Sequence, residues 1–228
     1  MDGILLVDKS SGWTSFDVVN YVRKRVAQAE GKKPKNTKVG HTGTLDPLAT
    51  GLLILVVGNY TKRAQQFTKL DKIYEVTMKI GETSTTGDRE GEITFVSAGK
   101  PRLAEVKRAL KKFTGEIMQT PPAFSAMKVK GQRAYKLARA GKEVKLEPRP
   151  VKIYSIKLKS YVYPEVQFVA EVSSGTYIRS LVEDLGRELA AAAYMSALRR
   201  TKVGEFDITN AVDIEQLPQD LPIRLIEK

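Results

Sequence analysis

The sequence predicts a protein built from both helices and strands, on the basis of three patterns. A continuous apolar run, 52–57, is typical of a strand that is buried on both faces. Residues 71–80 alternate between apolar and polar side chains, as in a half-buried strand. Apolar residues recur at helical spacing in three further segments, which begin near Phe16, Leu103 and Ile178.

The N-terminal segment is predicted to form a strand over 3–8, a turn over 9–12 and then a helix. Thr14 or Ser15 can cap that helix, because either hydroxyl can accept a hydrogen bond from the backbone of the first turn. The basic segment 32–38 contains a proline and is predicted to be a solvated loop.

The polar stretch 81–91 looks at first like a phosphate-binding loop. It lacks the Gly-Lys-Ser/Thr ending and carries three acidic residues, so nucleotide binding is not expected. A strand is predicted near 93–96. Pro101 suits the first turn of the next helix, and Gly115 can end that helix. The apolar face predicted for it is Leu103, Val106, Leu110 and Phe113.

The last third of the chain is predicted to contain two strands between 149 and 173, with a turn at Pro164. A helix follows from Ile178, and Asp213 can cap a last short helix.

The charge balance of the chain points to a polyanionic partner. The 228 residues include 38 Lys and Arg against 26 Asp and Glu, which gives a net charge of +12. A surplus of this size favours nucleic acid, although a surface kept soluble by its charge is the simpler reading.

Several classes of protein are disfavoured. Cysteine is absent and histidine occurs once, which excludes a disulfide framework and argues against a conventional zinc site. The N-terminus lacks the pattern of a signal peptide, and no apolar run approaches the ~20 residues of a membrane helix. A cytoplasmic protein without a bound metal is therefore predicted.

The most unusual stretch of the chain is 40–51, Gly-His-Thr-Gly-Thr-Leu-Asp-Pro-Leu-Ala-Thr-Gly. Its glycines and proline mark a tight, irregular loop that holds the single histidine, His41, and the carboxylate of Asp46. A polar loop that feeds a buried strand is a common place for chemistry. Taken alone, the stretch is equally a turn that Asp46 caps.

This stretch resembles the catalytic motif of the TruB family of tRNA pseudouridine synthases, G-H-x-G-T-L-D-P-x-A-x-G. The resemblance implies that Asp46 is the nucleophile and that His41 stacks in the distorted T loop of the RNA. Residues 9–15 are similar to the family's K-P-x-G-x-T-S, with Ser10 in place of the proline, which removes some rigidity from the turn.

Three further motifs extend the resemblance along the chain. Tyr74 matches the tyrosine of a K-x-Y element, which implies stacking on the target base and a part in proton transfer. Tyr177 and Arg179 match G-T-Y-I-R, in which the tyrosine lines the base pocket and the arginine pairs with the catalytic aspartate. Leu198 opens L-R-R-T-x-V-G and is expected to pack on the base. Independently of the family, an arginine at a helix start opposes the helix dipole and needs an acidic partner.

Upstream of Leu198, Ala192 and Tyr194 depart from the glycine and histidine common in the family, which puts local contacts there in doubt but not the chemistry.

Residues 121–141 mix basic, aromatic and turn residues and resemble the family's thumb, which closes over the T loop. A solvated basic loop with a short helix is the alternative. The resemblance implies that Tyr135 packs and that the thumb, at about 120–147, supplies RNA contacts. The candidate RNA-binding residues are Lys128, Lys130, Arg133, Lys136 and Arg139.

Taken together, the resemblance implies the α+β pseudouridine-synthase fold, a long mixed and mostly antiparallel sheet flanked by helices. It implies one catalytic domain over 1–228 without the PUA domain of bacterial members. The expected activity is isomerisation of the T-loop uridine at tRNA position 55, without cofactor or metal, by a monomer that binds the T arm. Whether the carboxylate attacks the sugar or the base is left open.

Two other functions remain possible at this stage, an RNA-binding chaperone without catalysis and a pseudouridine synthase for another RNA. Loss of Asp46, Tyr74 or Arg179 would have indicated the chaperone, and all three residues are present.

Overall fold

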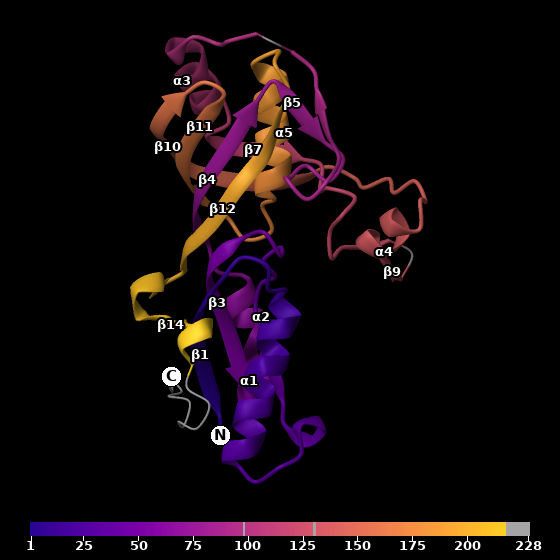
Figure 1. Ribbon diagram of the computed structural model, residues 1–228, viewed down its shortest axis with the longest axis vertical. Helices are drawn as coiled ribbons and strands as arrows, with labels where there is room; N and C mark the ends of the chain where they lie inside the picture. Colours follow the sequence, from indigo (N-terminus) through magenta and orange to yellow (C-terminus); the bar gives the residue numbers. More distant parts are fainter. Residues whose placement is uncertain (98, 130, 218–228) are drawn as a thin grey trace. The chain divides into compact units, whose positions relative to one another are not determined.

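The computed structural model describes residues 1–97, 99–129 and 131–217 (Figure 1). It divides into two compact units. Unit 1 consists of Met1–Tyr74 and the described residues from Leu198 onward, and unit 2 consists of Glu75–Ala197. Within the described residues, no helix combines the length and the apolar character needed to cross a membrane.

The main sheet is mixed, and its strands are β1 (Gly3–Lys9), β2 (Val39–His41), β3 (Thr50–Val57), β4 (Lys72–Ile80), β7 (Gly115–Gln119), β10 (Arg149–Val162), β11 (Glu165–Val172), β12 (Ala193–Val203), β13 (Phe206–Asp207) and β14 (Val212–Asp213). Their hydrogen-bonded order is β14-β1-β3-β12-β4-β11-β10-β7, with β2 on β3 and β13 on β12. Parallel pairing joins β14 to β1 and β12 to β3. Antiparallel pairing joins β1 to β3, β2 to β3, β7 to β10, β10 to β11 and β12 to β13. The predicted α+β class, with a mixed and mostly antiparallel sheet, is confirmed.

Two small hairpins lie outside the main sheet. They are β5 (Glu82–Ser84) with β6 (Ile93–Phe95), and β8 (Lys128–Val129) with β9 (Gln132–Arg133). The helices are α1 (Ser15–Ala29), α2 (Ala64–Thr68), α3 (Leu103–Lys112), α4 (Ala134–Arg139) and α5 (Ile178–Glu188), with the 3-10 turns η1 (Pro34–Asn36), η2 (Gly58–Arg63), η3 (Ile208–Asn210) and η4 (Ile214–Gln216).

In unit 1, α1 begins as its sequence predicts. Thr14 is the N-cap and accepts a hydrogen bond from the backbone of Asp17, whose side chain accepts one in return from the backbone of Thr14. The apolar residues at helical spacing in α1, Val18, Val19, Val22 and Val26, are buried. Figure 1 shows α1 running beside β3, and the strands bury an apolar core that includes Ile4, Ile54 and Phe206.

In unit 2, α3 differs from its prediction. It begins at Leu103 with Arg102 as N-cap, so Pro101 precedes the helix instead of lying in its first turn. Leu103, which is predicted on the apolar face of this helix, is 46% exposed, and Ala109 is buried instead. The helix stops at Lys112, and Gly115 starts β7 with φ 115°, a conformation that favours glycine.

The other sequence-predicted elements are present, including the two long strands β10 and β11, the turn at Pro164, helix α5 and the Asp213 cap of η4. The strand β12 was not predicted. Its C-terminal half, residues 198–203, carries four polar or charged side chains in succession and therefore lacks the apolar alternation of β4.

Candidate active site

In unit 1, the loop that carries Asp46 joins β2 to β3, and the first residue of α1 and the turn before it hold the loop on both sides of the aspartate. The hydroxyl of Ser15 accepts a hydrogen bond from Leu45 N (2.8 Å) and donates one to Leu45 O (2.9 Å). On the other side, Pro47 O accepts from the backbone of Gly12 at 2.9 Å. Asp46, which is half-buried, is therefore held by its two chain neighbours.

Lys9, at the end of β1, adds a buried cation beneath this loop. Its side chain is fully buried, and Nζ donates to the carbonyls of Trp13 (2.7 Å), Ser10 (3.0 Å) and Pro47 (3.2 Å). Hydrogen bonds from a charged donor are stronger than those between neutral groups. Lys9 thus joins the end of β1, the turn before α1 and the Asp46 loop.

Arg200 on β12 holds the other end of the same loop. The side chain is buried, with Nε donating to Leu52 O at 2.7 Å and Nη2 donating to Gly43 O at 3.0 Å. β12 pairs with β3 at Arg200 and Gly51, where a Cβ would lie 2.3 Å from Arg200 O. Only glycine fits this close approach, and the φ of 104° at Gly51 also favours it.

His41, at the end of β2, is partly buried, and within the described structure its buried Nδ1 has no hydrogen-bond partner. Burial, and then the charge of Arg200, lower the pKa of His41 below its usual value. The imidazole is therefore neutral near pH 7 and keeps an unused polar atom.

Tyr74 and Leu198 belong to unit 1 and lie on the neighbouring strands β4 and β12. Tyr74 is buried and Leu198 is half-buried. Two residues before Tyr74, the ammonium of Lys72 donates to the carbonyls of Thr68 (2.8 Å) and Leu70. Burial, and then the nearby charge of Arg200, lower the pKa of Lys72 to about 8.

In unit 2, Arg179 lies in the first turn of α5 and is buried. Its Nη1 donates to Thr86 O at 2.9 Å, and its Nη2 donates to Phe124 O at 2.8 Å. Nη1 is also 3.6 Å from the carboxylate of Asp88, which is buried as well. The acidic partner that the helix dipole requires is therefore present, but it is a residue that the sequence did not single out.

Asp88 contacts Arg179 and also accepts hydrogen bonds within its own polar loop, 81–91. Its Oδ1 accepts from Thr86 Oγ1 at 2.6 Å and from the backbone of Glu90 at 3.0 Å. A Cβ on Gly87, whose φ is 75°, would lie 2.5 Å from the carboxylate of Glu183. The stretch 81–91, which looks at first like a phosphate-binding loop, instead positions the buried side chain of Arg179.

Tyr177 is the N-cap residue of α5, and its backbone is clamped by the side-chain amide of Gln119 at the end of β7. Gln119 Nε2 donates to Tyr177 O at 3.0 Å, and Tyr177 N donates to Gln119 Oε1 at 2.8 Å. The half-exposed ring lies under the guanidinium of Arg149, 5.1 Å from its centroid. The clamp fixes the backbone that presents this ring, and no motif had drawn attention to Gln119.

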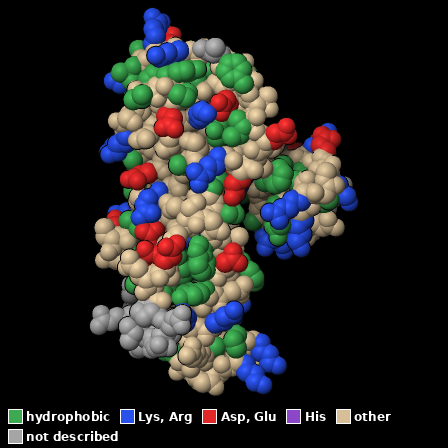
Figure 2. Space-filling view, viewed as in Figure 1, with side chains coloured by type: hydrophobic (Ala, Val, Ile, Leu, Met, Phe, Trp, Pro, Cys, Tyr) green, Lys and Arg blue, Asp and Glu red, His purple; other side chains and the backbone are tan. Residues whose placement is uncertain are grey.

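The thumb segment forms the hairpin β8–β9 and the short helix α4, all in unit 2. Figure 2 shows Lys and Arg side chains gathered over this segment. Its exposed candidates are Lys128, Arg133, Lys136 and Arg139, and Lys130 lies outside the described residues. Arg139 lies over the ring of Tyr135, 5.8 Å from the centroid.

The predicted site residues therefore fall into two groups. Unit 1 holds His41, Asp46, Tyr74 and Leu198, and unit 2 holds Tyr177, Arg179 and the thumb. The pairing of Asp46 with Arg179 stays a prediction. In the part of the chain that the structure describes, no cluster of three His, Cys, Asp or Glu side chains could hold a metal ion.

Comparison with known sequences gives consistent matches along most of the chain. The N-terminal domain of TruB family pseudouridylate synthases matches residues 31–178, and the C-terminal domain of tRNA pseudouridylate synthase B matches residues 179–222. A protein of Aquifex aeolicus named tRNA pseudouridine synthase B is 44% identical over 218 residues, which cover 95% of this chain and 73% of that protein. A protein of the same name from Opitutus terrae is 39% identical and is matched over 91% of its length by the whole of this chain.

Among solved structures, the chain is similar to one in the crystal structure of a Cbf5-Nop10-Gar1 complex, with a TM-score of 0.72 and 29% identity. The match covers 94% of this chain and 53% of that one, so the chain spans about half the length of this structural relative. The matches and the fold together show that the chain belongs to the TruB family of pseudouridylate synthases.

Proposed function

We propose that this protein isomerises uridine to pseudouridine in tRNA, at position 55 of the T loop, with Asp46 as the nucleophile. The observation that carries the proposal is the Asp46 loop itself, in which both neighbours of the aspartate are bound by buried polar groups. A reacting carboxylate gains most from a fixed position, because orientation lowers the entropic part of the barrier.

The reaction moves one bond and leaves the composition of the RNA unchanged. The bond between C1′ and N1 of the uridine breaks, the uracil turns, and a bond forms between C1′ and C5. C5 loses its proton and N1 gains one, so no redox step and no net hydrolysis occur. An ionised carboxylate can support this by attacking the sugar, as glycosidase carboxylates do, or by attacking the uracil ring.

In this proposal Arg179 pairs with Asp46 and keeps it ionised, since a nearby positive charge favours the deprotonated form of a carboxyl group. Asp88 and the carbonyls of Thr86 and Phe124 hold the guanidinium in place and so act as positioning groups for Arg179.

The target base has to leave its stack before a carboxylate can reach its sugar. Tyr74, Tyr177 and Leu198 form the apolar slot that receives it, and the hydroxyl of Tyr74 serves in proton transfer. The neutral ring of His41 stacks in the opened T loop. The exposed cations of the thumb bind backbone phosphates, and the protein acts in the cytoplasm as a monomer.

The test is to map pseudouridine in an unmodified tRNA transcript after incubation with the purified protein and with its Asp46→Asn variant. We expect one modified T-loop uridine with the wild type and none with the variant, while both proteins bind the tRNA equally. Asp71→Asn, which changes an exposed carboxylate of unit 1, is the matched control and should remain active. Activity of Asp46→Asn within a few-fold of wild type would rule out the proposed nucleophile.

A further inference from the structure

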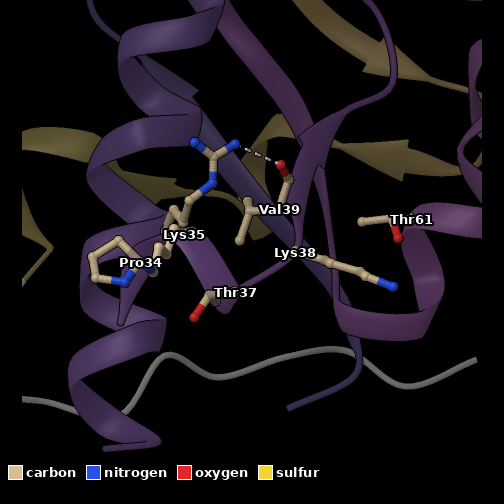
Figure 3. A pocket seen from close by; sticks show the side chains of 7 residues that line it. Pro34, Lys35, Thr37, Lys38, Val39 and Thr61 are labelled. Atoms are coloured by element: carbon tan, nitrogen blue, oxygen red, sulfur yellow. Dashed lines mark hydrogen bonds between the residues drawn. The ribbon is translucent and has the colours of Figure 1, made fainter. Parts of the chain in front are cut away.

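A basic pocket of about 440 Å³ opens in unit 1 between α1, η1, β2 and η2 (Figure 3). Three of its lining side chains are cations, Arg23, Lys35 and Lys38, and two carry hydroxyls, Thr37 and Thr61. The remainder of the lining is apolar and no carboxylate contributes to it. The mechanism proposed above uses none of these residues.

The walls of the pocket are fixed by hydrogen bonds. Arg23 on α1 donates from Nη1 to Asn20 Oδ1 at 2.7 Å and from Nη2 to Val39 O at 3.1 Å. The second bond is the dashed line in Figure 3, which ties α1 to β2. Gly58 N donates to Lys38 O at 2.8 Å and so joins η2 to the segment before β2. The guanidinium is therefore held at the pocket before any ligand arrives.

The charged side chains that line the pocket are all cations, while the nearby carboxylates of Asp2 and Glu30 bind Asn59 and Lys32. Lys35 and Lys38 are exposed, and among the described residues no carboxylate lies within ion-pair distance of either. The segment 32–38 contains four lysines and no acidic residue, and η2 adds Lys62 and Arg63. Figure 2 shows Lys and Arg side chains gathered at this end of the unit. The guanidinium and the two ammonium groups form a donor set suited to a phosphate group, whereas the hydroxyls of Thr37 and Thr61 donate to the backbone carbonyls of Lys33 (3.4 Å) and Gly58 (2.7 Å).

We propose that this pocket binds a phosphate of the RNA backbone that lies outside the target nucleotide; the inference rests on the proposed function. β3 starts beside the Asp46 loop at Thr50 and ends beside the pocket at Val57, which pairs with Val39. Six strand steps from Gly51 to Val57 span about 20 Å. A phosphate in the pocket therefore belongs to a nucleotide distant from the one that is isomerised, and it adds affinity and register without touching the chemistry.

The first test compares Lys35→Glu/Lys38→Glu with Lys157→Glu/Lys159→Glu, a control that reverses two exposed lysines on β10 of unit 2. Both variants change the net charge equally, so any difference between their Kd values for tRNA comes from where the substituted lysines lie. For the pocket variant we expect the Kd for unmodified tRNA to rise about tenfold at physiological salt, and the salt dependence of log Kd to fall by about one unit of slope. The rate with saturating tRNA should stay at the wild-type value. Equal effects from the two variants would overturn the proposal.

The second test removes one RNA charge at a time with methylphosphonate linkages. We expect one neutralised position, outside the target nucleotide, to weaken binding by the wild type and to have no further effect on the pocket variant. Inorganic phosphate tests the other source of the same chemistry. If it binds the wild type and not the pocket variant while tRNA binds both equally, the ligand is free phosphate and the proposal is wrong.

These tests separate the pocket from the proposed function. Pseudouridine mapping with the wild-type protein decides the function, and the binding slopes decide the pocket. If the wild type forms no pseudouridine, but the pocket variant weakens tRNA binding more than the control variant does, the proposed function is wrong and the phosphate-binding pocket is supported.

Discussion

Basic side chains occur in two kinds of environment in this protein, and the two regions differ in what the cations contact. The interior cations, Lys9, Lys72, Arg179 and Arg200, are buried, and each donates to at least two backbone carbonyls. In contrast, the described RNA-binding candidates of the thumb, Lys128, Arg133, Lys136 and Arg139, are exposed on short elements. The net charge of +12 hides this division, because it counts both groups alike.

The two environments differ in how precisely the cation has to be placed. A buried cation whose removal leaves carbonyls unpaired fixes the backbone around it, so the interior cations set the position of the Asp46 loop and of the α5 start. An exposed cation attracts phosphate over a distance and tolerates imprecise placement. We therefore expect substitutions of the interior cations to change rate or stability, and substitutions of the exposed cations to change RNA affinity.

The largest effect is expected at Arg179. Arg179→Met should lower the single-turnover rate by about a thousandfold or more, because the proposed partner of Asp46 and an anchor of two carbonyls are both lost. Without the guanidinium, the carboxyl group takes up a proton more readily, so the residual rate should rise with pH.

The matched control for that variant is Arg187→Met, which removes an exposed arginine near the end of the same helix. Its rate should equal that of the wild type. A variant of Arg179 that binds tRNA poorly but reacts at the wild-type rate once bound would show that Arg179 contacts phosphate, and the ion-pair argument would be wrong.

Arg200 provides the second test. Arg200→Met should lower the free energy of unfolding by about 2–4 kcal/mol, because the carbonyls of Gly43 and Leu52 lose their buried donor. Lys202→Met on the same strand, whose side chain is half-exposed, should change it by less than about 0.5 kcal/mol. Denaturant unfolding of both variants measures the difference. Equal free energies of unfolding would show that Arg200 does not stabilise the backbone around it as the other interior cations are expected to do.

Lys72 gives a pH-dependent test of the same interior group. Its pKa is lowered to about 8 in the folded chain, so between pH 8 and 10.5 the unfolded chain holds more protons. Stability contributed by this residue therefore increases with pH in that window and is flat below it. Between pH 8 and 9, the wild type should gain about 1 kcal/mol relative to Lys72→Met. A constant difference between the two proteins across that window would show that the ammonium is not desolvated.

How much of the fold and of the candidate site can be predicted from the sequence depends on how far apart along the chain the contacting residues lie. The Thr14 cap of α1 and the alternating strand β4 follow from rules that act over a few residues, and both are present. Asp46 and Arg179 were named through the family resemblance. Asp88 and Gln119 were missed because their partners, Arg179 and Tyr177, lie 91 and 58 residues further along the chain. No local pattern marks an acid or an amide that acts at such a separation.

The smallest effect is expected in the thumb, where it also separates the two groups of cations most clearly. Lys136 is exposed on α4, and among the described residues no carboxylate lies within ion-pair distance of it. Lys136→Ala should raise the Kd for tRNA about threefold and reduce the salt slope by about 0.7–0.9, the change expected for one phosphate contact. The free energy of unfolding and the rate at saturating tRNA should both stay at wild-type values, because no buried group loses its partner. A lower rate at saturation would place Lys136 among the groups that position the RNA for reaction, and the division between interior and exposed cations would then fail at the thumb.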